Sequence, residues 1–210
     1  MPIKTEFLLA SDSKTIPRAI EILHSGGLVA FPTDTVYGVG ALAFDDKAVE
    51  SIYIAKDRPI EKAIPVLIAD ITDLEKVGMD IPGSAYRLAS RFWPGPLTVL
   101  VPKKPTLPES VSATATVGVR VPDHDIARAL LRAAGPMAVT SANISGQQSP
   151  STAEEVFAQL SGRIDLIIDG GKTPGGVPST LVDCAGDEIK ILREGPVSAE
   201  EIREIGRIEN

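Results

Sequence analysis

The chain has 210 residues, with 21 Lys and Arg against 28 Asp and Glu, which gives a net charge of −7. This balance argues against broad, sequence-independent nucleic-acid binding, which needs a dominant basic surface. The apolar share of 43% supports one sizeable core, and an aromatic share of 4% makes that core aliphatic. No apolar run approaches the roughly 18–20 residues of a membrane span, and the run at residues 7–10 is too short for a signal peptide. We therefore expect one domain, a cytoplasmic location and no membrane contact.

In the first half of the chain, three segments have apolar residues at helical spacing and three have short continuous apolar runs. The spacing predicts helices over residues 15–25, from 45 or 46 to before Pro59, and over 84–92. The apolar runs predict buried strands over residues 28–31, 64–69 and 97–101.

The second half of the chain continues in the same style. The pattern predicts helices over residues 124–134, from 151 or 152 to about 160, and from Ser198 onward. It predicts strands over residues 117–121, 137–140, 164–168, 180–182 and 189–192. Some of these strands are joined through helices and others directly, which indicates a mixed parallel and antiparallel α/β sheet.

Several catalytic chemistries have no residues to support them. Two histidines and one cysteine cannot form a zinc cluster, and neither a Gly-x-Ser-x-Gly elbow nor a His-Glu-x-x-His motif occurs. Gly171-Lys172-Thr173 imitates the end of a P-loop, but Leu166 stands where that motif requires its first glycine. We expect residues 170–176 to form a flexible turn, with a mobile flap as the functional alternative.

A cluster of cations lies just past the second predicted helix, at Lys56, Arg58 and Lys62. Pro59 disfavours the α-helical conformation at Arg58, and in an extended segment Lys56 and Arg58 face the same side, with Asp57 facing away. Such a pair suits a polyphosphate, although an ordinary solvated loop would show the same charges.

Further polar residues follow or interrupt apolar strands. Ser141 and Asn143 come directly after a strand, at the edge where α/β sheets bind ligands, but both residue types also favour turns. Arg120 stands among valines and needs an anionic partner, which a ligand or a protein carboxylate would supply equally well. Gly118, on the same face as Arg120, would leave room for a ligand. Together these signals indicate a pocket for an anion.

At this point the sequence resembles the YrdC-like threonylcarbamoyl-AMP synthase family over residues 10–205. The matching passages are FPTDTVYG at 31–38, KDRP at 56–59, WPGPLT at 93–98, TSANISG at 140–146, PSTLVD at 178–183 and LREG at 192–195. Each passage is weak alone, and the ordered set is specific. The resemblance implies a single-domain twisted mixed sheet flanked by helices, with a concave ligand face and no second domain.

The resemblance also implies an activity. L-threonine, bicarbonate and ATP would give threonylcarbamoyl-adenylate and pyrophosphate, for modification of the tRNA adenosine beside the anticodon by a separate transfer machinery. Magnesium would accompany ATP, without a dedicated protein metal site. We expect at most a weak direct contact with RNA.

By the family pattern, specific residues take roles in this reaction. Lys56 and Arg58 would act at the reacting phosphate. The residues that would contact ATP are Lys56, Arg58, Lys62, Thr116, Asn143, Ser151 and Arg193. Those that would contact threonine are Thr35, Arg120, Ser141 and Ser179, with Arg120 on its carboxylate.

One departure from the family pattern is Asp57, which stands where many relatives carry Gly or Asn. Three rival functions remain. The first is an RNA-binding or ribosome-associated module of the same fold, the second a paralogue that matures hydrogenase through carbamoyl-adenylate, and the third a sister protein without synthase activity. The second normally carries additional acylphosphatase-like and zinc-finger domains, which do not fit here.

Overall fold

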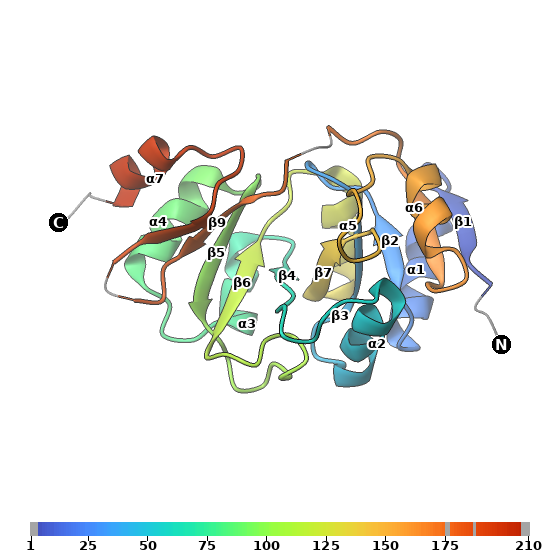
Figure 1. Ribbon diagram of the computed structural model, residues 1–210, viewed down its shortest axis with the longest axis horizontal. Coiled ribbons are helices and arrows are strands. Elements are labelled where there is room, and N and C mark those ends of the chain that lie inside the picture. The colour runs from blue at the N-terminus through green and yellow to red at the C-terminus, as the bar shows by residue number, and fades with distance from the viewer. Residues whose placement is uncertain (1–3, 175–176, 187, 207–210) are drawn as a thin grey trace.

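The computed structural model describes residues 4–174, 177–186 and 188–206, and its strands form one continuous sheet (Figure 1). In spatial order the strands are β1 (Glu6–Leu9), β8 (Leu166–Asp169), β2 (Val29–Phe31), β3 (Gly38–Leu42), β7 (Met137–Ser141), β4 (Val66–Leu67), β6 (Thr116–Arg120), β5 (Leu97–Pro102), β9 (Thr180–Asp183) and β10 (Lys190–Arg193). The pairs β1–β8, β8–β2, β4–β6 and β5–β9 are parallel, and the remaining neighbours are antiparallel. The predicted mixed sheet is confirmed.

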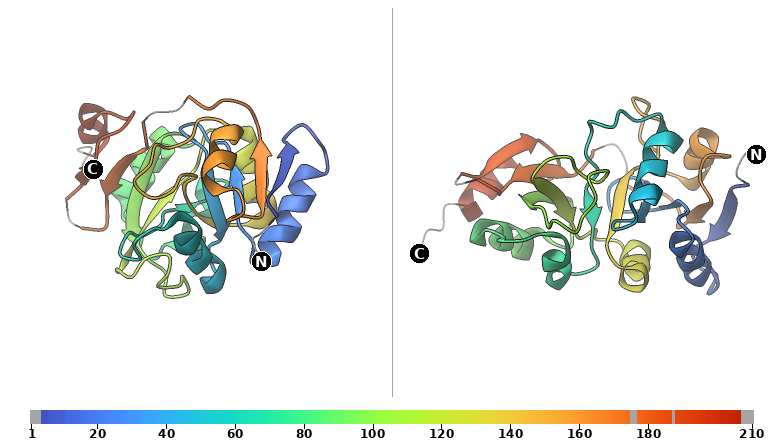
Figure 2. Two further views of the ribbon diagram at one scale, coloured as in Figure 1. Left: turned by 45° about the vertical axis from the view of Figure 1, so that its right-hand side comes forward. Right: turned by 90° about the horizontal axis from the view of Figure 1, so that it is seen from below.

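Helices cover the sheet unevenly. They are α1 (Thr15–His24), α2 (Asp46–Lys56), α3 (Leu74–Val77), α4 (Gly83–Phe92), α5 (Asp125–Ala134), α6 (Ala153–Leu160) and α7 (Ala199–Gly206), with a 3₁₀ turn at Ile71–Asp73. Seen from below, α1, α3, α4 and α5 line one side of the sheet, while α2 and α6 lie on the other (Figure 2). Strands β5, β6 and β9 face the viewer of Figure 1 with no helix of the described chain in front of them. The backbone of this half of the sheet has no described helix over it, although the side chains of Thr98 and Arg120 on these strands are buried.

Two apolar clusters hold the layers together. The first joins α1 and α5 to one face of the sheet through Leu23 and Leu130, both fully buried against Phe31 and Ile168. The second runs along the rest of the sheet and includes Ile52 of α2 and Leu88 of α4. Burial of these aliphatic side chains supplies the main favourable free energy of folding. No described helix has the length and apolar character needed to cross a bilayer.

Three of the predicted helices begin at side-chain caps that the structure contains. Asp45 accepts a hydrogen bond from the backbone N–H of Ala48 at 3.1 Å, so it is the cap of α2. Thr152, rather than Ser151, caps α6 by accepting from the N–H of Glu155 at 3.3 Å. At α7 the Ser198 hydroxyl accepts from the N–H of Glu201 at 3.3 Å. Each cap satisfies a backbone donor that the first helical turn leaves free.

Strands account for the main differences from the sequence prediction. β1 and β3 were not predicted, and the predicted strand over 64–69 is paired only over Val66–Leu67. Pro65 has no N–H to donate, and the N–H of Ile64 turns to the carbonyl oxygen of Val111 at 2.9 Å. The prediction of a six-residue strand was therefore wrong at its first end, because the chain leaves the sheet there.

β3 escaped prediction because its sequence, GVGAL, lacks the bulky side chains typical of strands. Its glycines permit a close approach to β7. A Cβ on Gly40 would stand 2.5 Å from the carbonyl oxygen of Ala138, and one on Gly38 would stand 2.7 Å from Cγ1 of Val139. Close packing between neighbouring strands, and not β propensity, explains these residues.

Candidate active site

Lys56 is the last residue of α2 and is almost completely buried, at 1% exposure. Its ammonium group donates hydrogen bonds to the carbonyl oxygens of Ser141, the last residue of β7, and of Asn143, two residues further on. Burial and the neighbouring Arg58 lower the pKa of Lys56 to about 7. Among the described residues no carboxylate pairs with this lysine. A buried cation without a protein counter-ion is typical of a site that binds an anion.

Arg58 lies beside Lys56, but not for the reason that the sequence suggested. Lys56 is helical and Asp57 adopts a left-handed conformation, with φ of 50°, so the predicted extended i, i+2 geometry is wrong. The turn at Asp57 brings the two cations together, and burial lowers the pKa of Arg58. The Arg58 guanidinium donates to the carbonyl oxygens of Lys62 at 3.1 Å and Ala63 at 2.9 Å. It thereby holds its own loop in shape.

Asp57 is directed away from these cations, as expected. Its carboxylate pairs with Arg163 at 2.8 Å on an exposed part of the surface. Arg163 also donates to the carbonyl oxygen of Ala55 at 3.3 Å. The acid beside the cation pair therefore has a partner of its own.

Ser141 and Asn143 contribute backbone carbonyls to the site, a role that their side chains did not suggest. The Asn143 amide nitrogen donates to the carbonyl oxygens of Ile144 at 2.8 Å and Gln147 at 2.9 Å. Its Oδ1 atom is buried and accepts no hydrogen bond from the described residues. An unpaired buried acceptor costs free energy, so it marks a position where a ligand donor would be stabilising.

Arg120 ends β6 and is buried at 6% exposure. Its guanidinium pairs with the carboxylate of Asp34 and donates to Thr35 Oγ1 at 3.2 Å and the carbonyl oxygen of Gly95 at 3.0 Å. Burial lowers the pKa of Arg120, and Asp34 opposes that shift. The sequence left open whether a ligand or a protein carboxylate meets this arginine. Without ligand, the partner is Asp34.

The room expected above Gly118 is largely taken. A Cβ at this position would lie 3.2 Å from Cγ2 of Thr98 and 3.4 Å from Cβ of Pro65. The interpretation of Gly118 as space for a ligand is therefore wrong. The glycine accommodates side chains from the neighbouring strand and loop.

Ser179 and Arg193 form the other side of the site, at β9 and β10. The buried Ser179 hydroxyl lies 2.8 Å from Thr98 Oγ1, and Arg193 donates to the Ser179 carbonyl oxygen from Nε at 3.0 Å. Burial lowers the pKa of Arg193, and its charge in turn lowers the pKa of Arg120, so the two guanidinium groups are neighbours. Because Asp34 neutralises Arg120, the net positive charge at this side of the site comes from Arg193.

Three predicted residues lie at the edge of this arrangement. Lys62 is exposed, and its contacts in the described structure are made by its backbone, whose carbonyl accepts from Arg58 and Tyr53. Thr116 begins β6, at the opposite end of the strand from Arg120, and its hydroxyl lies 3.3 Å from Thr114 Oγ1. Ser151 is occupied with Glu155, whose carboxylate accepts from its N–H at 2.6 Å. The structure does not bring these three side chains against Lys56.

The segment predicted as a flexible turn over 170–176 is anchored at its start. The Tyr37 hydroxyl donates to the carbonyl oxygen of Gly171 at 2.7 Å and accepts from the N–H of Gly170 at 3.2 Å. Thr173 donates from its N–H to the carbonyl oxygen of Ser151 at 2.9 Å. Residues 175 and 176 of this segment lie outside the described residues. Over its described part, the segment is tied to the body of the protein.

Asp34 and His124 were not predicted as site residues. Asp34 lies between the two threonines of the 33–35 motif. The family pattern assigned a role to Thr35 in this motif and none to Asp34. His124 precedes α5, and its Nδ1 is buried without a partner among the described residues. Burial lowers the pKa of His124, and Asp34 has the largest of the opposing effects, ahead of Asp125 and Asp123. The need of Arg120 for an anionic partner was the one sequence signal that could have pointed to Asp34.

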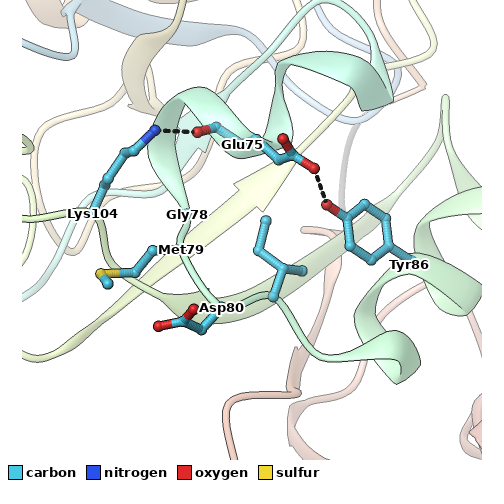
Figure 3. Close-up of a pocket in the computed structure, with 7 residues that line it drawn as sticks. Glu75, Gly78, Met79, Asp80, Tyr86 and Lys104 are labelled. Carbon is cyan, nitrogen blue, oxygen red and sulfur yellow. Dashed lines mark hydrogen bonds between the residues drawn. The ribbon is translucent and has the colours of Figure 1, made fainter.

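A separate pocket lies around α3, on the helix-covered side of the sheet. It has a volume of about 250 Å³ and is lined by Glu75, Gly78, Met79, Asp80, Ile81, Tyr86 and Lys104 (Figure 3). Tyr86 donates to the Glu75 carboxylate at 2.9 Å, and Lys104 donates to the Glu75 carbonyl oxygen at 2.7 Å (Figure 3). None of the predicted site residues lines this pocket. The polar groups of Glu75, Tyr86 and Lys104 already have partners, so the pocket does not replace the cation cluster as the candidate site.

Comparisons with known proteins identify the family of the chain and its fold. The family model Sua5_yciO_yrdC, described as "Telomere recombination", matches residues 21–195. A Bacillus subtilis protein named threonylcarbamoyl-AMP synthase is 44% identical over 200 residues, which cover 94% of this chain and 58% of that protein. The chain therefore spans little more than half the length of this relative.

Two solved structures share the fold. Sua5 of P. abyssi, complexed with L-threonine, matches with a TM-score of 0.90 and 41% identity, covering 96% of this chain and 60% of that one. YciO of E. coli matches with a TM-score of 0.84 and 29% identity, covering 95% of this chain and 99% of that one. Both likenesses extend over nearly the whole sheet and its helices.

Proposed function

The chain belongs to the Sua5/YciO/YrdC family, and on that premise we propose that it is a threonylcarbamoyl-AMP synthase. Its substrates are L-threonine, bicarbonate and ATP, and its products are threonylcarbamoyl-adenylate and pyrophosphate. The observation that carries the proposal is Lys56, a buried cation beside Arg58 with no carboxylate partner among the described residues. A polyphosphate supplies the missing negative charge.

The reaction needs little covalent chemistry from the protein. The threonine ammonium group first loses a proton, and the resulting amine reacts with bicarbonate to give a carbamate and water. A carbamate oxygen then attacks the α-phosphorus of ATP, and pyrophosphate leaves. Because the substrates supply both the nucleophile and the leaving group, catalysis depends on positioning and on charge stabilisation. The absence of a serine–histidine or cysteine–histidine pair from the predicted site fits this demand.

Two groups of side chains divide these tasks. Lys56 and Arg58 stabilise the phosphate charge, and Arg193 approaches from the β10 side. Arg120 binds the threonine carboxylate, with Thr35 and Ser179 nearby for its polar groups. Arg120 has five N–H donors, of which the described residues use three, so two remain for a ligand. This reserve supports a carboxylate-binding role even though Asp34 is already present.

We propose that magnesium arrives with ATP, held by phosphate oxygens and water molecules, and that it neutralises phosphate charge. Over residues 4–174, 177–186 and 188–206, no group of three or more His, Cys, Asp or Glu side chains is placed to hold a metal ion. Lys56, Arg58 and Arg193 would share the phosphates with the ion. The product would pass to a separate tRNA threonylcarbamoyl-transfer machinery, and a cytoplasmic location suits that role.

The decisive experiment measures pyrophosphate release with all three substrates and with each one omitted. Release should require ATP, L-threonine and bicarbonate together, and EDTA should abolish it. Robust release without threonine would point to a different acceptor. No release under any condition, combined with salt-sensitive RNA binding, would favour the RNA-binding alternative.

A further inference from the structure

Asp34 places a carboxylate beside Arg120, the residue proposed to bind the threonine carboxylate. Its side chain is 13% exposed and pairs with Arg120, whose side chain is 8% exposed. Removing two charges from water costs free energy, and a hydrophobic pair of similar volume would often be no less stable. The buried pair is therefore expected to add little to the free energy of folding. Its position in the proposed binding site suggests a role in ligand binding instead.

The hydrogen bonds of the pair leave capacity on both partners. Asp34 meets Arg120 through Oδ1, and its Oδ2 accepts no hydrogen bond from the described residues. Arg120 keeps two of its five N–H donors after its contacts with Asp34, Thr35 and Gly95. One free acceptor on an anion thus lies beside two free donors on a cation.

This combination matches one chemical class of ligand. An α-amino acid carries a carboxylate and an ammonium group separated by a single carbon atom, so it needs a cation and an anion side by side. The Arg120–Asp34 pair is neutral overall, like the zwitterion. His124, the other titratable group beside Asp34, is half-buried, which favours its neutral form. A simple carboxylic acid would bring negative charge to Arg120 and would leave Asp34 without a new partner.

We propose that Asp34 is a specificity-determining residue that binds the α-ammonium group of the substrate, while Arg120 binds its carboxylate. This inference rests on the proposed function. It goes beyond it by assigning the recognition of the amine, the group that becomes the carbamate, to a residue of this chain. Asp34 would hold that nitrogen in place before it reacts.

The test compares two ligands by calorimetric titration: L-threonine and 3-hydroxybutanoate, which keeps the carboxylate and the hydroxyl but lacks the amine. Wild-type protein should bind threonine at least tenfold more tightly than 3-hydroxybutanoate. Asp34→Asn should lose at least tenfold in threonine affinity. Its affinity for 3-hydroxybutanoate should be unchanged or higher, because Arg120 then lacks a competing carboxylate.

Asp70→Asn is the matched control. Asp70 also pairs with an arginine, Arg128, at 2.5 Å, but it lies outside the proposed binding residues. This variant should bind both ligands as the wild type does. Thermal melts of all three proteins show whether they are folded.

Each contrary outcome has a distinct meaning. If Asp34→Asn binds threonine normally, or loses affinity for both ligands equally, Asp34 does not recognise the amine. If that variant fails to fold, equal affinity of the wild type for the two ligands still overturns the inference. If the wild type binds no threonine, the proposed function fails and the inference fails with it.

Discussion

Arg193 donates two hydrogen bonds to the carbonyl oxygen of Ser179, at 3.0 Å from Nε and 2.8 Å from Nη2, and a third to its hydroxyl at 3.2 Å. The sequence assigned Arg193 to ATP and Ser179 to threonine. Their direct contact means that the proposed ATP site and the proposed threonine site are adjacent and are joined by this residue pair. A change in Arg193 should consequently affect the binding of both substrates.

Arg193→Lys tests this coupling. Lysine keeps the charge but has no planar fork, so it cannot reproduce the contacts with Ser179. We expect threonine affinity, measured without ATP, to fall by about threefold to tenfold, roughly 0.7–1.4 kcal/mol, and ATP affinity to fall as well. Calorimetric titration of each ligand alone measures both. Unchanged threonine affinity would show that the contact between Arg193 and Ser179 has no energetic consequence.

Arg58→Ala tests the phosphate contact. Loss of one preorganised charge should remove about 2–4 kcal/mol of transition-state stabilisation, which lowers kcat/KM. Because Arg58 also holds the carbonyl oxygens of Lys62 and Ala63, we expect a further loss of about 1 kcal/mol in the free energy of unfolding. Initial rates of pyrophosphate release and a denaturant titration separate the two effects.

Asp57→Asn is the matched control for Arg58→Ala, since it alters the adjacent charge in the same loop. Asp57 pairs with Arg163 at an exposed position, where ion pairs contribute little. The variant should retain near-normal turnover and stability. If it lost activity as Arg58→Ala does, general disturbance of the loop, rather than a phosphate contact, would explain both results.

Arg120 should be needed for folding stability as well as for threonine binding. Arg120→Met leaves the Asp34 carboxylate without its buried partner, which should cost about 3–5 kcal/mol in the free energy of unfolding. Arg120→Lys keeps a charge there and should lose less stability, yet at least tenfold in threonine affinity because the fork is gone. ATP affinity should stay close to wild type in Arg120→Lys.

The comparison for Arg120→Met is Arg128→Met, which breaks the more exposed pair with Asp70. That pair should contribute no more than about 1 kcal/mol. Thermal melts and urea titrations of both variants measure the difference. Equal stability losses would mean that burial of the Arg120–Asp34 pair has no special effect.

Lys56 should take up a proton when ATP binds. Its pKa in the free protein is about 7 because of burial and of Arg58, and nearby phosphate charge would raise that pKa. At a pH of about 8.5, the Lys56 side chain should be mostly neutral in the free protein and protonated in the complex with ATP. Calorimetry in buffers of different ionisation enthalpy should detect this uptake. Lys56→Arg, which keeps its proton, should abolish it.

The same depressed pKa predicts how stability depends on pH. Between about 7 and the ordinary value of 10.5, the unfolded chain binds more protons at Lys56 than the folded chain does. The contribution of this group to stability therefore rises with pH over that window and is lost as the pH falls toward 7. Denaturant titrations should show that the free energy of unfolding of the wild type rises with pH over this window relative to that of Lys56→Met. A pH-independent difference would contradict the depressed pKa.

Local sequence patterns determined the order and type of most elements. Helical spacing and caps such as Asp45 and Ser198 act within a few residues, so the sequence contains their whole cause. Residue types and their neighbours likewise marked Arg120 as a charge in need of an anion, and Lys56 and Arg58 as a pair suited to a polyphosphate. These features depend on short-range geometry or on residue type alone.

Only the tertiary structure decided which groups meet. β3 exists because its glycines let it approach β7, a contact between residues about 100 positions apart that no local pattern records. Lys56 has its low pKa because the fold removes it from water beside Arg58, with no carboxylate among the described residues to pair with it, and Arg120 meets Asp34 across 86 positions. Burial and charge pairing depend on the arrangement of the whole sheet, so the sequence supplied the charged groups while the fold determined their partners and their protonation.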